Sequence, residues 1–180
     1  MFMRPMDELE TAEMTPDLLR PAASDGFETF FEVSFEGLLR ALYLVTGDRE
    51  EAGDLAQDAF LRVWQHWDRV QTMESPEGYL YRTAMNLWRN RLRSAAHAAR
   101  RAMSRQEARD PFSDADDRDQ VIRALRALTP RQRAALALVD LMEFTSEEAG
   151  QMLGIRASTV RALATQGRTE LRVRKESKDE

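Results

Sequence analysis

The stretch TSEEAGQMLGIRASTVRALATQGRTELR, residues 145–172, decides the fold of the second half of this chain. Thr145 with Glu148 forms a capping box that begins a helix, and Gly154 ends it because glycine tolerates a positive φ. Gly150 is small where a second helix must approach the first, and Val160 can pack back against it. The spacing predicts two helices joined by a tight turn, with a plain helical hairpin as the alternative.

Similar start and stop signals occur in the rest of the chain. Thr129-Pro130-Arg131-Gln132 is a second capping box with proline in the first turn. Gly47 and Asp48 supply a stop and a new cap, and Ser75-Pro76 begins another helix. No strand pattern competes, so we predict an all-α chain. The expected helices cover residues 27–45, 49–67, 76–93 (continuing towards 105), 120–127, 130 onwards, 146–153 and 157–173, and residues 68–74 are expected to form a loop.

Charge divides the chain into segments, although its 180 residues carry a net charge of only −5. Residues 71–106 have seven basic and two acidic side chains, and residues 120–172 have eight and five. Residues 107–119 are acidic and contain proline and serine. We therefore predict two small helical domains joined by an acidic linker. The expected division is an extension at 1–25, domains at 26–106 and 120–173, the linker at 107–119 and a tail at 174–180.

Composition argues against several classes of function. The chain has no cysteine, so neither a disulfide framework nor a thiolate metal site can form. His66 and His97 have no ligands at metal-site spacing, and no phosphate-binding glycine motif or nucleophile elbow occurs. No apolar run approaches the roughly 18–20 residues that cross a membrane, and residues 1–10 do not resemble a secretory signal. We expect a cytoplasmic protein that is not an enzyme and uses no metal or cofactor.

The helix pair at 145–172 favours binding to duplex DNA. In such a pair the second helix lies in the major groove, with its N-terminal residues at the base edges. The side chains best placed to meet bases are Ser158, Thr159, Arg161, Ala162 and Thr165. Phosphate contacts orient a protein without reading sequence, and Arg156, Arg168 and Arg172 are better placed for these.

The basic block at 71–106 suggests a second kind of nucleic-acid contact. Helical spacing puts four polar side chains on one face, beside three rings: Arg82, Asn86, Arg89 and Arg93, with Tyr79, Tyr81 and Trp88. Rings that stack on bases and guanidinium groups that bind phosphates suit single-stranded DNA. The preceding loop is able to receive a base turned out of the stack. The alternative is that the rings belong to the core and the arginines form a solvated face.

The helix expected at 49–67 is apolar on more than one side. Ala52, Ala56, Ala59 and Val63 form one row, whereas Leu55, Phe60, Leu61 and Trp64 spread around other sides. Such a helix either lies deep in a core or holds a partner.

In these segments the chain resembles sigma factors of the extracytoplasmic-function (ECF) group. Residues 55–64 (LAQDAFLRVW) are similar to that family's second-region helix, and residues 76–86 (PEGYLYRTAMN) resemble the helix that follows. Residues 128–133 (LTPRQR) and 147–172 resemble its fourth region. The resemblance spans residues 27–172 in family order. It implies a factor that binds core RNA polymerase and directs initiation at promoters.

The resemblance also implies a division of labour. The helix at 55–64 would bind the coiled coil on the polymerase β′ clamp through Leu55, Gln57, Asp58, Phe60, Leu61 and Trp64. The first domain would read and open the −10 element with Gln71, Thr72, Met73, Tyr79, Arg82, Asn86, Arg89 and Arg93. The second would dock on the β flap and read the −35 element with Arg156, Ser158, Thr159, Arg161, Ala162, Thr165 and Arg168. An inhibitory anti-sigma partner is common in this family.

The chain departs from the family pattern in its last helix. Leu163 and Gln166 stand where basic residues are frequent, and Gly167 costs about 1 kcal/mol relative to alanine inside a helix. Two other functions remain open. One is a helix-turn-helix regulator that binds duplex operators by itself. That function would not explain the pattern of residues 52–93. The other is a sigma-like protein that sequesters an inhibitor without reading promoters.

Overall fold

The computed structural model describes residues 24–102 and 120–179, and every regular element in these ranges is helical. The predicted all-α fold is confirmed. The expected linker at 107–119 and nearly all of the expected extension at 1–25 lie outside the described residues. The elements are α1 (Ser24–Thr46), α2 (Arg49–Trp64), α3 (Trp67–Val70), α4 (Pro76–Ala102), α5 (Gln120–Arg126), α6 (Pro130–Leu136), the π-helix η2 (Ala137–Leu141), α7 (Ser146–Leu153) and α8 (Ala157–Asp179).

Helices α1, α2 and α4 form a first helical module around an apolar core. Gly47, at φ +75°, ends α1, and Asp48 caps α2 by accepting from the Glu51 amide at 2.8 Å. The predicted alanine row of α2 is fully buried, as are the inner residues of α1 and α4. Small residues on α2 let the three helices approach closely. The fully buried core residues here include Leu38, Leu42, Val45, Ala52, Ala56, Ala59, Val63, Leu80 and Ala84.

The segment after α2 differs from the prediction. The helix ends at Trp64 and not at 67, and one helical turn, α3, lies where the sequence suggested a loop. Trp67 and Val70 are buried, and this burial holds the turn against the module. A single turn anchored by two apolar residues is too short to give a helical period in the sequence.

Helices α5 to α8 with η2 form a second module. Capping boxes begin α6 at Thr129 and α7 at Thr145, as predicted. The π-helical turn η2 was not predicted, and α8 runs to Asp179, beyond the expected end at 173. The extra turns of α8 are polar, and Arg174 in them pairs with Glu170, one turn earlier, at 3.0 Å.

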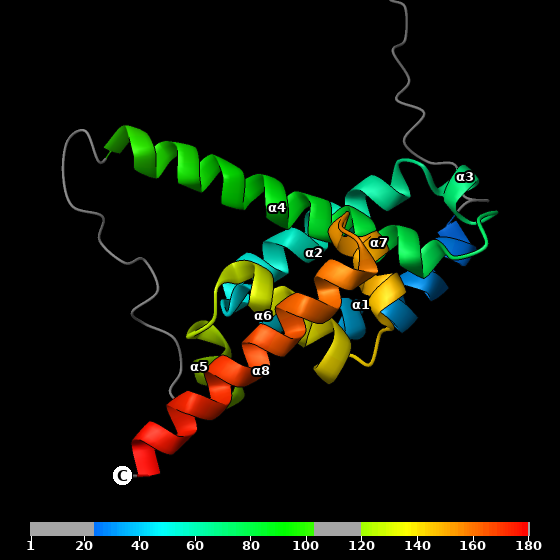
Figure 1. Ribbon diagram of the computed structural model, residues 1–180. Helices are drawn as coiled ribbons and strands as arrows, with labels where there is room; N and C mark the ends of the chain where they lie inside the picture. The colour runs from blue at the N-terminus through cyan, green and yellow to red at the C-terminus, as the bar shows by residue number, and fades with distance from the viewer. Residues whose placement is uncertain (1–23, 103–119, 180) are drawn as a thin grey trace, which may run out of the picture.

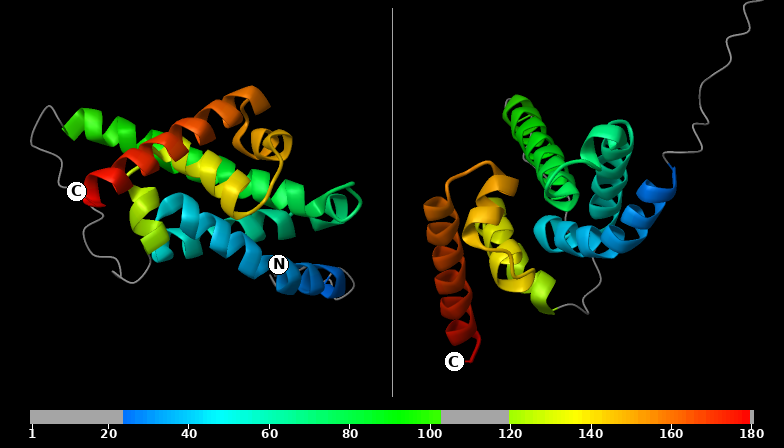
Figure 2. Two further views of the ribbon diagram at one scale, coloured as in Figure 1. Left: turned by 60° about the horizontal axis from the view of Figure 1, so that its bottom comes forward. Right: turned by 90° about the vertical axis from the view of Figure 1, so that its right-hand side faces the viewer.

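The two modules pack against each other (Figure 1). Figure 2 shows the blue-to-green helices of the first module beside the yellow-to-red helices of the second. Contacts join α4 with α7 and α1 with α6, and the buried apolar residues of both modules form one cluster. In residues 24–102 and 120–179, the structure has no helix that is both long and apolar enough to traverse a membrane.

Candidate nucleic-acid interface

Two glycines let α7 and α8 meet at a sharp turn. A Cβ on Gly150 would lie 2.8 Å from the carbonyl oxygen of Ile155, closer than real contacts allow. Gly154 ends α7 with φ +62°, in the left-handed region that favours glycine. The Ile155 amide donates to the Gly150 carbonyl at 3.0 Å, and Val160 is fully buried. The predicted helix-turn-helix geometry is confirmed.

The start of α7 is fixed by reciprocal hydrogen bonds. The Glu148 carboxylate accepts from the Thr145 amide at 2.8 Å and from the Thr145 hydroxyl at 2.7 Å. The Thr145 hydroxyl oxygen accepts from the Glu148 amide at 3.2 Å. These bonds lower the pKa of Glu148 because they stabilise its ionised form. The first helix of the pair is therefore held by a charged cap.

The residues of α8 and its cap that were predicted to contact the −35 element are open to solvent. All seven are exposed: Arg156, Ser158, Thr159, Arg161, Ala162, Thr165 and Arg168. Two of the arginines are paired in the free chain. Arg161 contacts Glu147 at 3.1 Å, and Arg168 binds Asp140 bidentately at 2.7 and 2.6 Å. The bonds to Asp140 raise the pKa of Arg168. A DNA phosphate would compete with this carboxylate for the guanidinium group.

Two of the three departures on α8 have a packing explanation, whereas Gln166 is exposed. Gly167 is buried where α8 crosses α6, and a Cβ there would lie 3.1 Å from Leu136 Cδ1 and 3.4 Å from Leu128 Cδ1. Leu163 is half-buried and packs against the core. Both residues therefore contribute to packing within the module. The close packing at Gly167 offsets the lower helix propensity of glycine.

The polar face of α4 is only partly open. Arg82 and Arg93 are exposed, whereas Asn86 and Arg89 are half-buried against α7. Arg89 donates to the Leu153 carbonyl and to the Asn86 side-chain oxygen. Burial, followed by the charges of Arg93 and Arg131, lowers the pKa of Arg89. The four residues share a face, as predicted, but the second module lies over part of it.

The rings beside this face are mostly core residues. Tyr81 and Trp88 are each 2% exposed, so the prediction that they stack on bases is wrong. Burial, then the charge of Glu77, raises the pKa of Tyr81 to about 12. Tyr79 is half-buried and is the one ring of the three with an accessible surface. The alternative of core rings holds for Tyr81 and Trp88, which are buried in the cluster that both modules share: Tyr81 packs against Phe144, and Trp88 lines a cavity beside the second module.

The loop before α4 presents two of its three predicted residues. Gln71 and Thr72 are exposed, and Met73 is half-buried against the core. The Thr72 hydroxyl donates to the Arg69 carbonyl at 2.8 Å, which closes the turn after α3. Ser75 accepts from the Gly78 amide at 2.9 Å and begins α4. Short local bonds thus fix both ends of this loop.

The predicted polymerase-binding set on α2 divides in two. Leu55 is fully buried and Phe60 is 4% exposed, so neither is available to a partner, and that part of the prediction is wrong. Leu61 and Trp64 are 53% and 42% exposed. Gln57 and Asp58 are exposed, and Asp58 accepts from Arg91 at 3.0 Å. Of the predicted set, Gln57, Asp58, Leu61 and Trp64 are therefore accessible.

Phe31, on α1, extends this surface. Phe31 is 36% exposed, and its ring lies 4.7 Å from that of Phe60. Phe27 packs edge-on against Trp64, at 4.8 Å between centroids. Spacing along α1 does not show which ring a neighbouring helix leaves accessible, so neither phenylalanine was predicted to contact a partner.

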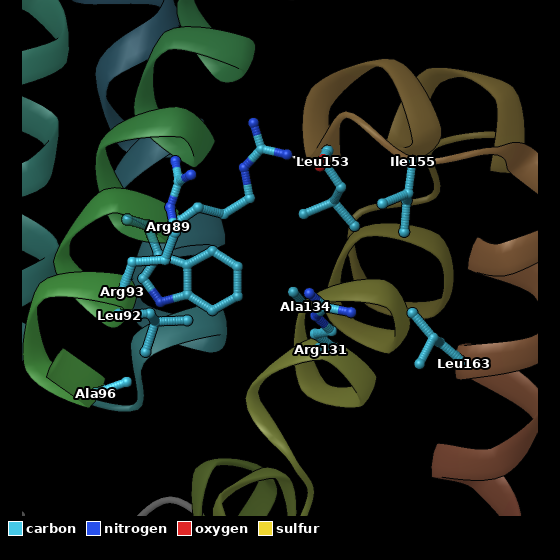
Figure 3. A pocket seen from close by; sticks show the side chains of 10 residues that line it. Arg89, Leu92, Arg93, Ala96, Arg131, Ala134, Leu153, Ile155 and Leu163 are labelled. Atoms are coloured by element: carbon cyan, nitrogen blue, oxygen red, sulfur yellow. Dashed lines mark hydrogen bonds between the residues drawn. The ribbon is translucent and has the colours of Figure 1, made fainter. Parts of the chain in front are cut away.

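A cavity of about 360 Å³ lies between α4 and the second module (Figure 3). Its lining holds three arginines, from α4 and α6, but no carboxylate. The other lining residues are apolar or aromatic, so the cavity suits an anionic or apolar group better than a cation. In residues 24–102 and 120–179, no group of three or more His, Asp or Glu side chains is arranged to hold a metal. The lining residues are Trp88, Arg89, Leu92, Arg93, Ala96, Arg131, Ala134, Leu153, Ile155 and Leu163.

Comparison with known proteins identifies the two modules. Residues 35–98 match Sigma-70 region 2, and residues 118–171 match Sigma-70, region 4. The ECF RNA polymerase sigma factor SigE of Mycolicibacterium smegmatis is 29% identical over 161 residues, which are 84% of this chain and 62% of that protein. This chain thus spans less than two thirds of that relative's length. The RNA polymerase sigma-E factor of Streptomyces avermitilis is 27% identical over 157 residues, 85% of this chain and 87% of that one.

Solved structures agree with the fold. The sigma factor RpoE of Bartonella quintana, in its complex with the anti-sigma factor NepR, superimposes with a TM-score of 0.66 at 18% identity, covering 81% of this chain and 94% of that one. Both matched regions, in this order, lie on the two helical modules described above. The chain belongs to the sigma-70 family of RNA polymerase sigma factors, in its extracytoplasmic-function group.

Proposed function

We propose that this chain is a sigma subunit that binds core RNA polymerase and directs it to specific promoters. The observation that carries the proposal is the pairing of an exposed helix-turn-helix face with a separate module whose helix α4 carries a basic face, in the order that the matched regions have. The chemistry of transcription would belong to the polymerase. This chain would supply recognition and strand opening, would act in the cytoplasm where polymerase works, and would not be an enzyme.

The second module would read the −35 element through α8. Arg161, Ser158 and Thr159 lie exposed at the end of the helix that a major groove receives. Arg156 and Arg168 would bind phosphates, and Arg168 would leave Asp140 when it does so. Both ion pairs on this face are solvent-exposed, so their exchange for phosphates has a small energetic cost.

The first module would bind polymerase and read the −10 element. Leu61 and Trp64 offer an exposed apolar surface, with Gln57 and Asp58 as polar neighbours, for the coiled coil of the β′ clamp. Gln71, Thr72 and Tyr79 would meet a separated strand, and Arg82, Arg89 and Arg93 would bind its phosphates. The exposed edge of the aromatic cluster, Phe31, would extend the polymerase contact.

Run-off transcription tests the proposal. Purified chain and core polymerase are added to a library of templates in which the −35 and −10 positions are randomised, and transcribed templates are sequenced. We expect enrichment of one promoter class that core enzyme alone does not transcribe. Arg161→Ala should relax the preference at one −35 position, while Arg174→Ala, further along α8, should not. Absence of any enrichment from folded chain that binds core enzyme would refute the proposal.

A further inference from the structure

An ion pair joins the two helices of the helix-turn-helix at the end that would meet DNA. Glu147 lies in the first turn of α7, and its carboxylate accepts from Nη1 of Arg161, one turn into α8, at 3.1 Å. Arg161 is the first arginine of α8, and Ser158 and Thr159 are exposed just before it. An arginine that we assign to base contact is therefore already held by a carboxylate from the preceding helix.

This pair differs in geometry from the other ion pair on the same face. Asp140 accepts from Nε and Nη2 of Arg168 at 2.7 and 2.6 Å, so it uses one whole edge of that guanidinium group. Glu147 contacts Arg161 through Nη1, and this bond does not use the edge that carries Nε and Nη2. Arg168 must leave its partner before that edge can bind a phosphate. Arg161 can offer the same edge to a base while its partner stays in place.

An open guanidinium edge of this kind matches guanine. Two parallel N–H donors fit the O6 and N7 acceptors that guanine presents in the major groove, which is the commonest specific contact of an arginine. A long side chain that is free to move must be ordered when it binds, and this ordering costs entropy. A carboxylate that holds one nitrogen beforehand restricts the directions in which the open edge points. A restricted pair of donors favours one base more strongly than a freely moving pair does.

The ion pair contributes orientation and adds little to stability. The side chains of Arg161 and Glu147 are 59% and 67% exposed, and exposed pairs of this kind stabilise a fold only weakly. The carboxylate also brings a negative charge towards the phosphates of a bound duplex, which weakens binding to any sequence. Its two effects on DNA binding therefore have opposite signs. It should lower the affinity for duplexes in general and raise the discrimination at one base pair.

We propose that Glu147 is a positioning residue, which holds Arg161 so that the guanidinium group reads one guanine of the −35 element. This inference rests on the proposed function, since Arg161 belongs to the face that would read this element. It adds a residue outside the set predicted to contact DNA. Glu147 acts through the arginine and does not touch the base.

Base preference is measured on the full-length chain without polymerase, because the side chain of Arg161 is exposed in the free chain. Duplexes with randomised positions are selected at low salt, and the bound fraction is sequenced. Wild type should favour guanine at one position. Glu147→Gln, which keeps the size of the side chain and removes its charge, should reduce that preference about three- to tenfold. Its affinity for the unselected duplexes, measured by fluorescence anisotropy, should rise.

A double-mutant cycle separates positioning from direct contact with DNA. In an Arg161→Ala background, Glu147→Gln should not change the preference at this position any further, because the side chain that Glu147 orients is gone. The matched control is Glu170→Gln. It also removes one negative charge and one exposed ion pair, formed with Arg174 at 3.0 Å, but lies further along α8. The control should keep the wild-type preference for guanine.

Four results would overturn the inference. Wild type that selects no guanine, or Glu147→Gln with an unchanged preference, would show that the pair does not orient a reading group. An equal loss in the Arg161→Ala background would show that Glu147 contacts a base itself. An equal loss in Glu170→Gln would attribute the effect to net charge. Unchanged melting temperatures confirm that the variants fold. The proposed function fails separately, through absent promoter-specific transcription by wild type with core polymerase, whatever the selection gives.

Discussion

Two glycines determine how α7 and α8 meet in the helix-turn-helix. Gly150 leaves space for the Ile155 carbonyl, and Gly154 supplies the left-handed turn between the helices. Gly53, in α2, is different: a Cβ added there would meet nothing within 4 Å. Glycine is therefore required at position 150 but not at position 53.

This contrast gives a prediction for stability. Gly150→Ala should lower the free energy of unfolding by about 1–3 kcal/mol, because the added methyl collides with backbone atoms. Gly53→Ala should raise it by about 0.4–1 kcal/mol, because alanine restricts the unfolded chain and fits the helix. Urea unfolding followed by circular dichroism measures both. Equal midpoints for Gly150→Ala and wild type would contradict the close approach.

The charged cap of α7 gives a prediction for pH. The pKa of Glu148 is lowered in the folded chain by its bonds to Thr145, so ionised Glu148 stabilises the fold. This stabilisation is complete above about pH 4.3, the usual pKa of a glutamate, and is lost as the pH falls through the lower folded pKa. Glu148→Gln should therefore melt at a lower temperature than wild type at pH 7 but at the same temperature near pH 3.

The capping box of α6 allows the reverse substitution, from glutamine to glutamate, as a control. Gln132 accepts from the Thr129 amide at 3.1 Å, in the geometry that Glu148 adopts at Thr145. Gln132→Glu should stabilise the chain at pH 7 and have no effect near pH 3. Thermal melts at the two pH values compare the variants. A pH-independent difference for Glu148→Gln would show that the carboxylate charge has no role in the cap.

At the scale of elements, α2 shows how one helix can fill a core and still keep an apolar strip accessible. Its alanine row lets α1 and α4 approach, Leu55 and Phe60 fill the interior, and Leu61 and Trp64 remain outside. A helix buried all round would have no such accessible strip. The apolar strip lies next to Asp58 and Gln57. A partner that covers the strip must therefore offer hydrogen bonds to these two side chains.

A charge on this strip should weaken the polymerase contact without unfolding the helix. Leu61→Glu is expected to weaken binding to core polymerase at least about tenfold, because a buried interface residue would become an unpaired carboxylate. The melting temperature should change little, since Leu61 is 53% exposed. Biolayer interferometry with immobilised core enzyme measures the affinity.

The matched control is Val33→Glu on α1. Val33 is an exposed aliphatic residue, 79% accessible, and is not part of the proposed contact. The Val33→Glu variant should bind core polymerase as tightly as wild type does. If both substitutions weaken binding equally, the effect comes from net charge, and the assignment of α2 to the polymerase is incorrect.

At the scale of the whole molecule, the two modules together determine how tightly DNA is bound. Each offers few basic side chains, and in the free chain Arg161, Arg168 and Arg89 are engaged by other groups of the protein. Binding to DNA that relies on a few phosphate contacts is weak at physiological salt. When both modules are fixed on one polymerase, the second contact becomes intramolecular.

We therefore expect the free chain to bind its promoter roughly 10² to 10⁴ times more weakly than the complex with core polymerase. Electrophoretic mobility shifts on a promoter selected by run-off transcription measure the two affinities at the same salt concentration. Raising the salt should weaken binding by the free chain steeply, since phosphate contacts dominate. Equal, tight binding with and without core enzyme would instead indicate a regulator that acts by itself.

The sequence by itself determined the features that depend on neighbours along the chain. The caps at Thr129 and Thr145, the turn at Gly154 and the buried alanine row all follow from local hydrogen bonding, backbone freedom and helical spacing. The exposed reading residues of α8 follow for the same reason, because the helix-turn-helix spacing fixes which side faces inward.

Only the tertiary structure decided which apolar side chains are accessible and which polar face is covered. Tyr81 and Trp88 are interior, and Leu55 differs from Leu61 in burial, because neighbouring helices close one side and leave another open. The bond from Arg89 to Leu153 joins residues 64 positions apart, and that from Arg82 to Gln151 joins residues 69 apart. Helical periodicity extends over a few turns, so it carries no information about contacts at such separations.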